Sequence, residues 1–491
     1  MTREGVVASP LSDAKGTSAY RVKRGTEGDL LFNHMLKLLR FLSYLLVFLI
    51  PWQARYFWRL GELNGGAWEY GTISIYGWES LALGVIILSV GYWAFSPEWR
   101  MRMREVWRGF TKTGLEWPLA FVWLWILAGA GWAVDSDLAL YGLGRLELLL
   151  CLGFVWVCLS LNPKKIAVCF LLACVLQGYL GMMQFFLQSD IVGENKYLGV
   201  SAHDPSELGT SIVDTGLRRW LRAYGTLPHP NIFGGLMAAG LVIAAYWVMD
   251  VGRRVTSASR KIFFEMIGAW MSVVIIFSGL MVSFSRSAWI GAGVGISAYF
   301  FFLWRAYRKN SEWPVIRLSL LKLCSIVLAM IIVFYLLLAP LFETRFGVEG
   351  ALEQQSVDTR LDQGREFFAI IKQKGITGVG IGNYTAYLSS FIRSEEPAWT
   401  YQPIHNIYLL ILAELGLVGL SIIGYFLWKS RICIRQIFKN IFDPADPWTR
   451  ISISILLGLA VIGLFDHYLW SMAVGWWVAL FLLIILRAIK F

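Results

Sequence analysis

The sequence predicts an all-α, polytopic integral membrane protein. Of its 491 residues, 57% are hydrophobic and only 16% are charged, which is too apolar for one soluble core and its surface. Apolar runs of about 18 to 23 residues, enough to cross roughly 30 Å of hydrocarbon as helix, recur from near Leu38 onward. We therefore expect about 12 transmembrane helices, joined in part by two larger outward-facing loops.

The N-terminal segment differs from the rest of the chain. Residues 1–35 are polar and mixed in charge, so we expect a flexible cytoplasmic tail. No cleavable signal peptide is visible there, and the first apolar run is expected to serve as its own insertion signal. Residues 36–491 then form a single transmembrane domain. The six cysteines fall in predicted spans or on the predicted cytoplasmic side, so we expect no disulfide, no metal site and no cofactor.

Basic residues set the predicted orientation. With a cytoplasmic N-terminus, every alternate loop carries lysines and arginines, as the positive-inside rule requires, and both termini are cytoplasmic. The net charge of +11 is thus a topology signal, and nucleic acid is not an expected partner. The residues concerned are Arg100, Arg102, Arg104, Arg108, Lys164, Lys165, Arg253, Arg254, Arg260, Lys261, Arg305, Arg308, Lys309, Lys429, Arg431, Arg435, Arg487 and Lys490.

Two long loops fall on the opposite side, at residues 189–230 and 341–404. Loops longer than about 15 residues are more often functional than accidental, so we place the active site on this outer face. The second loop has a helical pattern from Arg365 to Ile371, followed by a glycine-rich run from Gly378 to Tyr384. That run lacks the Lys-Ser/Thr ending of a nucleotide-binding loop, and a tight turn is the better interpretation.

His405 is the leading candidate for chemistry, because it stands at the mouth of a long apolar helix. A neutral imidazole can accept a proton near pH 7. Arg222, just before the sixth predicted span, and Arg286, at the turn between the seventh and eighth, emerge on the same side. Two guanidinium groups at a membrane boundary suit a lipid diphosphate. For either arginine alone, snorkelling or loop capping is an equally good interpretation.

Other polar residues are given structural interpretations. Arg218 and Arg219 precede Trp220 and could extend the anionic site, but anchoring of an amphipathic segment is favoured. His229 lies between two prolines, which indicates a rigid turn. Asp466 and His467 could assist His405, but an exposed interfacial pair is favoured. Interhelical pairing or cavity lining is expected for the ionisable residues inside spans, Glu79, Arg145, Glu147, Glu265 and Glu414.

Together these residues resemble a known family. His405-Asn406, nine residues, then Gly416-Leu-Val-Gly419 is similar to the H-N-x9-G-x-x-G signature of the bacterial O-antigen ligases. Arg222 and Arg286 are similar to the two arginines that this family places around undecaprenyl diphosphate. The resemblance covers residues 218–419 well. It implies a GT-C-like fold in the bacterial inner membrane, with the active site on the periplasmic face.

The resemblance also implies a reaction. An inverting, metal-independent glycosyltransferase would move a glycan from undecaprenyl diphosphate to an acceptor, with His405 as catalytic residue and Arg222 and Arg286 at the diphosphate. The supporting candidates are Arg218, Arg219, Arg360, Tyr384 and Asn406. The expected partners are the undecaprenyl-diphosphate-linked glycan, lipid A-core or another glycan acceptor, and membrane lipid.

The acceptor is left open by these motifs. We favour an O-antigen ligase acting on lipid A-core, but an O-antigen or exopolysaccharide polymerase and a protein O-oligosaccharyltransferase share the signature. A lipid-linked glycan flippase or transporter would also need many spans and basic groups, although along a path across the bilayer. A receptor without catalysis would leave the clustering of one histidine and two arginines unexplained.

Overall fold

The computed structural model describes residues 18–190, 199–200, 202–207, 209–254, 259–347, 351–479, 481 and 484. Within these residues the chain is mostly helical, with three two-stranded antiparallel sheets. Eight described helices are long and apolar enough to cross a membrane, and two more are apolar but shorter. The polytopic character predicted from the sequence is thereby confirmed. The count of about 12 spans and the GT-C-like type stay predictions.

The helices and strands follow in chain order. The helices are α1 (Ser18–Leu49), α2 (Gly77–Phe95), α3 (Pro97–Thr111), α4 (Glu116–Gly129), α5 (Ser136–Leu159), α6 (Pro163–Leu187), α7 (Pro230–Arg254), α8 (Arg260–Val282), α9 (Arg286–Tyr307), α10 (Trp313–Phe346), α11 (Ala351–Lys374), α12 (Tyr384–Tyr387), α13 (Ile407–Lys429), α14 (Arg431–Asn440), α15 (Pro447–Ile462) and α16 (Tyr468–Ser471). The strands are β1 (Arg55–Arg59), β2 (Glu62–Leu63), β3 (Gly66–Ala67), β4 (Ile73–Tyr76), β5 (Ile212–Asp214) and β6 (Arg219–Leu221). Short 3-10 turns are η1 (Glu69–Gly71), η3 (Ala398–Thr400) and η4 (Ala473–Trp477), and η2 (Leu388–Ile392) is a π-helical turn.

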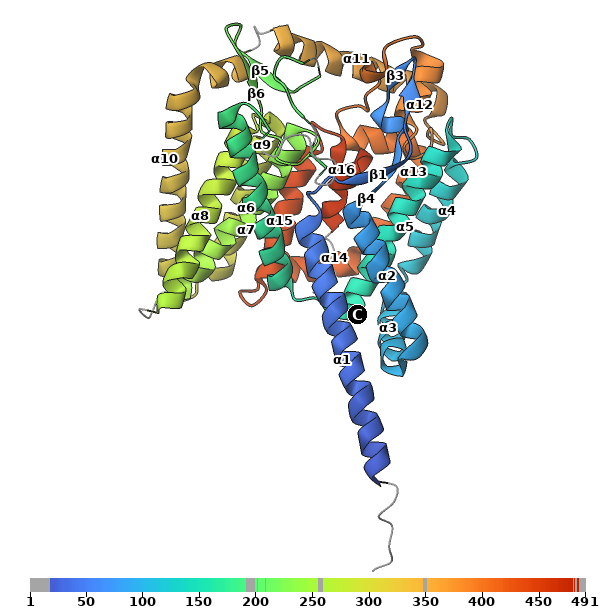
Figure 1. Cartoon of the computed structure of the whole chain (residues 1–491), viewed down its shortest axis with the longest axis vertical. Coiled ribbons are helices and arrows are strands. Elements are labelled where there is room, and N and C mark those ends of the chain that lie inside the picture. The colour runs from blue at the N-terminus through green and yellow to red at the C-terminus, as the bar shows by residue number, and fades with distance from the viewer. Residues whose placement is uncertain are drawn as a thin grey trace, which may run out of the picture.

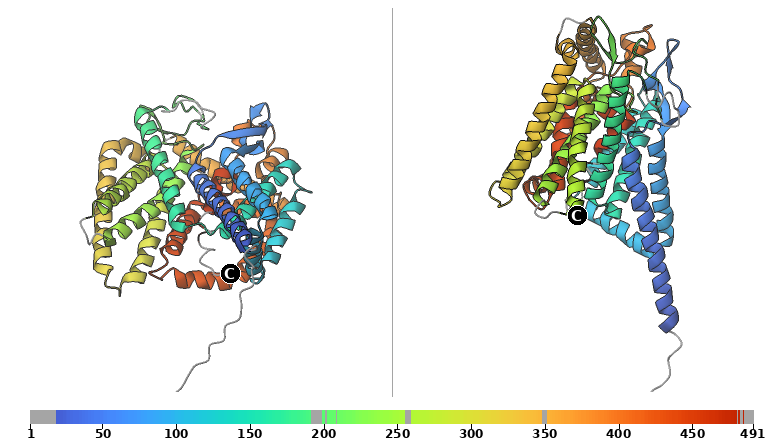
Figure 2. Two further views of the ribbon diagram at one scale, coloured as in Figure 1. Left: turned by 60° about the horizontal axis from the view of Figure 1, so that its bottom comes forward. Right: turned by 60° about the vertical axis from the view of Figure 1, so that its left-hand side comes forward.

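The bundle is organised around α7. In its membrane-length window 94% of the residues are buried, against 11% in α10, which lies at the edge (Figures 1 and 2). Helices α8 and α9 pack on α7, and α15 packs on α9. The small residues Gly291 and Gly295 of α9 permit this last contact, since a Cβ on Gly291 would lie 2.8 Å from the carbonyl oxygen of Gly458. This is the close helix packing expected from their spacing.

The two ends of the bundle differ in character. Figure 1 shows the strands, α11 and α12 at one end, here called the loop end, and the basic helices α3 and α14 at the other. Helix α1 begins at Ser18 and projects beyond the bundle on the side of α3. Residues 1–17 of the predicted tail lie outside the described residues. The segregation of basic helices from the loops agrees with the predicted alternation of sides.

Ionisable residues in the apolar helices are held by partners, as predicted. A charge buried in low dielectric is costly unless it is paired or hydrogen-bonded. The contacts are Arg145 with Glu79 at 3.0 Å, Arg254 with Glu265 at 2.7 Å, Trp123 Nε1 donating to Glu147 at 2.7 Å and Trp470 Nε1 donating to Glu414 at 2.7 Å. All five predicted positions pair with a residue on another helix, and Glu414 also lines a pocket that is described below.

Helix α13 is interrupted at Gly416, which has φ +67° and ψ −177°. The segment that contains the glycine-rich run packs against this break: the N–H groups of Val379 and Gly380 donate to the carbonyls of Ala413 and Glu414. Trp125 Nε1 donates to the Leu415 carbonyl at 2.8 Å, so carbonyls freed by the break are satisfied. Gly378, Gly380 and Gly382 all have positive φ, which fits the predicted turn. The contact fixes the second outer loop onto the helix that follows His405.

Candidate active site

The first turn of α13 fixes the position of His405. Asn406 caps the helix, with its Oδ1 accepting the backbone N–H groups of Tyr408 and Leu409, each at 3.0 Å. Its Nδ2 donates to the Leu464 carbonyl at 3.2 Å, which ties the start of α13 to the end of α15. The Asn of the signature therefore has a clear local role: it holds the residue before it at the helix mouth.

His405 is held from the second outer loop by Gln363, on α11. The Oε1 atom of Gln363 accepts the backbone N–H of His405 at 3.2 Å and lies 2.9 Å from Nδ1 of the ring. A backbone N–H can only donate, so this amide atom is an oxygen, and Nδ1 must carry the proton that is shared with it. Within the described chain, His405 Nε2 has no hydrogen-bond partner. Nε2 therefore carries the lone pair that can accept a proton.

Two further side chains lie beside His405. The rings of His405 and His467 are in edge-to-face contact, with centroids 5.0 Å apart. Asp466 Oδ1 accepts the backbone N–H of His467 at 2.8 Å. Asp466 is 5% exposed and His467 is 6% exposed, so the exposed interfacial pair expected from the sequence is wrong. Strands β1 and β4 pair antiparallel, and residues 55–76 are here called the hairpin; Tyr70, between these strands, packs edge-on against His467, with ring centroids 5.8 Å apart.

A hydrogen-bonded chain links this cluster to Arg222. Asn231 Nδ2 donates to Asp466 Oδ2 at 2.8 Å, and Arg222 Nη2 donates to Asn231 Oδ1 at 2.9 Å. Arg222 is buried, and its Nε donates to the carbonyl of Ser283 at 2.8 Å. Arg222 is thus fixed at both ends of its guanidinium, against the turn that joins α8 to α9 and against the residues beside His405.

Arg286 begins α9 at that same turn. Its Nη1 donates to the carbonyl of Arg345 at 3.3 Å, and Arg345 Nε donates to the carbonyl of Phe284 at 2.9 Å. Arg345, at the end of α10, thus joins Arg222 and Arg286 around one short turn. We call these three residues the arginine turn. Arg222 and Arg286 were predicted from the sequence to lie at one site. Arg345 was not, because it follows an apolar run with no motif around it.

A cavity of about 730 Å³ lies in front of His405. Its wall is shared by the hairpin, the first outer loop and the residues around α16. Its lining residues include His229, Asn231, Gln402, Asp466, His467 and Tyr468. His229 holds its place by two hydrogen bonds, since its Nδ1 accepts from the backbone of Asn231 at 3.1 Å and its Nε2 donates to Ser211 Oγ at 3.0 Å. Those bonds support the rigid turn expected there.

Burial sets the charge state of these histidines. It lowers the pKa of His405 below its ordinary 6.5, an effect that Asp466 opposes and Arg360 reinforces. It lowers the pKa of His467 to about 3, and that of His229 to about 3 as well. His405, His467 and His229 are therefore neutral at pH 7. A neutral His405 is the protonation state that a proton acceptor requires.

A second cavity, of about 500 Å³, lies between α7, α8, α9 and α10 and is lined almost wholly by apolar side chains. Trp289 and Phe346 line its wall, with ring centroids 5.6 Å apart. Trp289 stands one helical turn after Arg286, and Phe346 follows Arg345 directly. An apolar space thus adjoins the arginine turn at the loop end of the bundle.

The supporting residues predicted from the sequence lie around the site rather than in it. Arg218 stacks on Trp220 at 4.4 Å, and Arg219 donates to the Ser206 carbonyl at 2.9 Å, as expected of anchoring residues. Arg360 lies on α11 three residues before Gln363. Tyr384 is 1% exposed in a hydrophobic cluster with residues of α11, and it lines a smaller pocket that adjoins the His405 cavity and is described below. Gln363 and Asn231 were not singled out from the sequence, since an amide carries no signal until its partners are known.

The comparison with known families agrees with the motif. Residues 271–424 match the family model described as O-antigen ligase. The match spans Arg286, Gln363, His405 and both signature glycines, whereas Arg222, Asp466 and His467 lie outside it. No curated protein matches the chain at a significant level.

Proposed function

Because residues 271–424 of this integral membrane protein belong to the O-antigen ligase family, we propose that it transfers a glycan from undecaprenyl diphosphate to an acceptor, with inversion. The acceptor we favour is lipid A-core. The membrane would be the bacterial inner membrane, with both termini cytoplasmic and the loop end periplasmic. The observation that carries the proposal is the geometry of His405: it lines a cavity next to the arginine turn, and its Nε2 has no hydrogen-bond partner among the described residues.

In the proposed step, a hydroxyl oxygen of the acceptor attacks the anomeric carbon of the donor glycan. The bond from that carbon to the diphosphate oxygen breaks, and its electron pair leaves with the diphosphate. The hydroxyl proton passes to Nε2 of His405. A sugar hydroxyl is much less acidic than an imidazolium, so the proton moves as the new bond forms. General-base help of this kind typically contributes about 10²- to 10⁴-fold in rate.

The arginine turn supports the assignment of the leaving group. Guanidinium groups bind phosphate oxygens through a planar fork and remain charged at every working pH. Charge that develops on the departing diphosphate would be stabilised there, and such stabilisation can equal or exceed the contribution of the base. The apolar cavity beside Trp289 and Phe346 would receive the first isoprenoid units of the lipid. A flippase is less well supported, because these arginines gather at one end of the bundle.

The experiment incubates purified protein with undecaprenyl-diphosphate glycan, either alone or with lipid A-core, and sizes the products. Glycan on lipid A-core supports the ligase. A lengthening ladder on undecaprenyl diphosphate would assign a polymerase, and transfer to neither acceptor would reject both. Arg286→Ala should raise the KM for the donor and lower kcat. Arg431 is a basic residue on α14 at the far end of the bundle, so Arg431→Ala is the matched control. It should change neither the donor KM nor kcat.

A further inference from the structure

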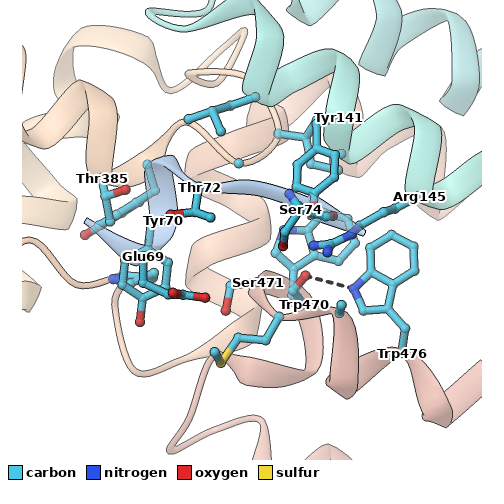
Figure 3. A pocket seen from close by; sticks show the side chains of 18 of the residues that line it. Glu69, Tyr70, Thr72, Ser74, Tyr141, Arg145, Thr385, Trp470, Ser471 and Trp476 are labelled. Carbon is cyan, nitrogen blue, oxygen red and sulfur yellow. Dashed lines mark hydrogen bonds between the residues drawn. The ribbon is translucent and has the colours of Figure 1, made fainter. Parts of the chain in front are cut away.

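A smaller pocket of about 90 Å³ adjoins the His405 cavity on the hairpin side. The two share the lining residues Arg55, Glu69, Tyr70, Tyr76 and Met472. Figure 3 shows Thr385, Tyr70 and Glu69 on one side of this pocket and Tyr141, Arg145 and Trp476 on the other. Since about 10–15 Å³ of such space admits one water molecule, the pocket can take the hydroxyl-bearing edge of a sugar ring. We call it the hairpin pocket.

The charges of the hairpin pocket do not suit a phosphate. Its two arginines are both neutralised, Arg55 by Glu69 at 2.5 Å and Arg145 by Glu79 at 3.0 Å. Glu414 adds a further carboxyl group to the lining. The pocket therefore presents no excess of positive charge, in contrast to the arginine turn. A neutral molecule rich in hydroxyl groups fits this balance, because carboxylate oxygens accept hydroxyl hydrogen bonds and ionised arginines donate them.

Aromatic rings form much of the remaining wall. Tyr70, Tyr141, Trp470 and Trp476 line the pocket, and hydrogen bonds hold the two indoles: Trp470 Nε1 donates to Glu414 at 2.7 Å and Trp476 Nε1 donates to the Trp470 carbonyl at 3.2 Å. Rigid rings present flat apolar faces on which the C–H face of a pyranose can pack. Carboxyl groups and ring faces together are the lining that a saccharide requires.

Thr385 provides an independent sign of a ligand. Its side chain is 1% exposed, it lines the hairpin pocket, and its Oγ1 has no hydrogen-bond partner within the described chain. A buried hydroxyl without a partner is costly, and proteins rarely keep one without a reason. A ligand hydroxyl in the pocket would satisfy it.

We propose that the hairpin pocket is the acceptor subsite, which binds a neutral saccharide unit and directs its hydroxyl to His405. The inference rests on the proposed function. In an inverting displacement the nucleophile and the leaving group lie on opposite faces of the anomeric carbon. The arginine turn joins the His405 cluster through Asn231, whereas the hairpin pocket joins it through Tyr70 and Ser471. Donor and acceptor thus approach His405 from different sides.

Thr385→Val tests this subsite, because it keeps the shape of the side chain and removes only the hydroxyl. Because Thr385 Oγ1 has no partner to lose within the described chain, the variant should unfold at the wild-type temperature or above. The KM for acceptor should rise about three- to tenfold, the worth of one neutral hydrogen bond, with the donor KM unchanged. Ser452→Ala is the matched control: Ser452 Oγ is also buried and unpartnered within the described chain, but it lies on α15 and lines neither cavity.

The outcomes separate the two proposals. An unchanged acceptor KM in Thr385→Val, or a raised donor KM, overturns the acceptor subsite while leaving the transferase intact. Binding of lipid-free core oligosaccharide, followed by saturation-transfer NMR, tests the pocket without catalysis. Binding that Thr385→Val weakens and Ser452→Ala does not weaken supports the subsite even where transfer fails. Binding that is equal in all three proteins, or absent from all three, overturns it.

Discussion

The side-chain oxygen of Gln363 accepts both the backbone N–H and the Nδ1 proton of His405. One amide on α11 thereby fixes the position of the histidine, the orientation of its ring and its tautomer. The other ring nitrogen, Nε2, makes no hydrogen bond to the residues that the structure describes, and it is the atom on which the proposed chemistry depends.

Gln363→Glu should move the pH dependence of transfer. A carboxylate beside Nδ1 favours the imidazolium, so it raises the pKa of His405, which burial holds below 6.5 in the wild type. The base is active only when neutral, and activity is lost as pH falls through this pKa. The acid limb of the kcat/KM profile should therefore shift to higher pH in the variant. Gln373→Glu, on the exposed face of the same helix, should leave the profile in place. An unshifted limb in Gln363→Glu would contradict the role of Gln363.

The stability of the fold should fall between pH 6.5 and pH 3, in part because of His467. Burial lowers the folded-state pKa of His467 to about 3, whereas the unfolded chain takes up the proton near 6.5. The unfolded state then binds more protons throughout this window, so the stabilisation is complete above pH 6.5 and declines as pH falls. Thermal unfolding in detergent at pH 7.5 and pH 4.5 measures the decline. His467→Gln should reduce it, with His229 supplying part of what remains. An identical decline in the variant would refute the buried neutral histidine.

Gly416→Ala should destabilise the protein by about 3 kcal/mol or more, because φ of +67° with ψ near 180° is a region that only glycine occupies readily. An added Cβ would also lie 2.3 Å from the Ile376 carbonyl oxygen. Gly424→Ala is the control in the same helix, since its Cβ would meet nothing within 4 Å. That change should be neutral or slightly stabilising. Comparable unfolding temperatures for the two variants would show that the break in α13 is not required.

Arg145→Met should destabilise the bundle by about 3–5 kcal/mol, because it leaves the buried carboxyl group of Glu79 without its partner. The double variant Glu79→Leu/Arg145→Met removes both charges and should recover most of that loss. Unfolding temperatures of the single and double variants decide the point. A double variant that is no more stable than Arg145→Met would mean that the pair is needed for more than mutual neutralisation.

The sequence allows the candidate base to be predicted, but not the residues that hold it in place. His405 and the glycines of α13 lie within one short motif, and periodicity locates the long helices. Gln363 lies 42 positions before His405, on a helix whose sequence is largely polar. Its contact with His405 forms only when α11 packs over the N-terminal end of α13. Asp466 and His467 follow an apolar run, which indicated exposure at an interface. Both are buried, and His467 packs against Tyr70 of the hairpin, a contact that apolar periodicity does not reveal.

The central claim is that Nε2 of His405 accepts the acceptor's proton, and a single-turnover comparison of wild type and His405→Ala tests it most directly. Donor lipid is bound first, its affinity is measured, and acceptor is then added in excess. The account predicts donor affinity within about twofold of the wild type, and transfer slower by about 10²- to 10⁴-fold. Transfer at the wild-type rate by His405→Ala, with donor bound normally, would contradict it.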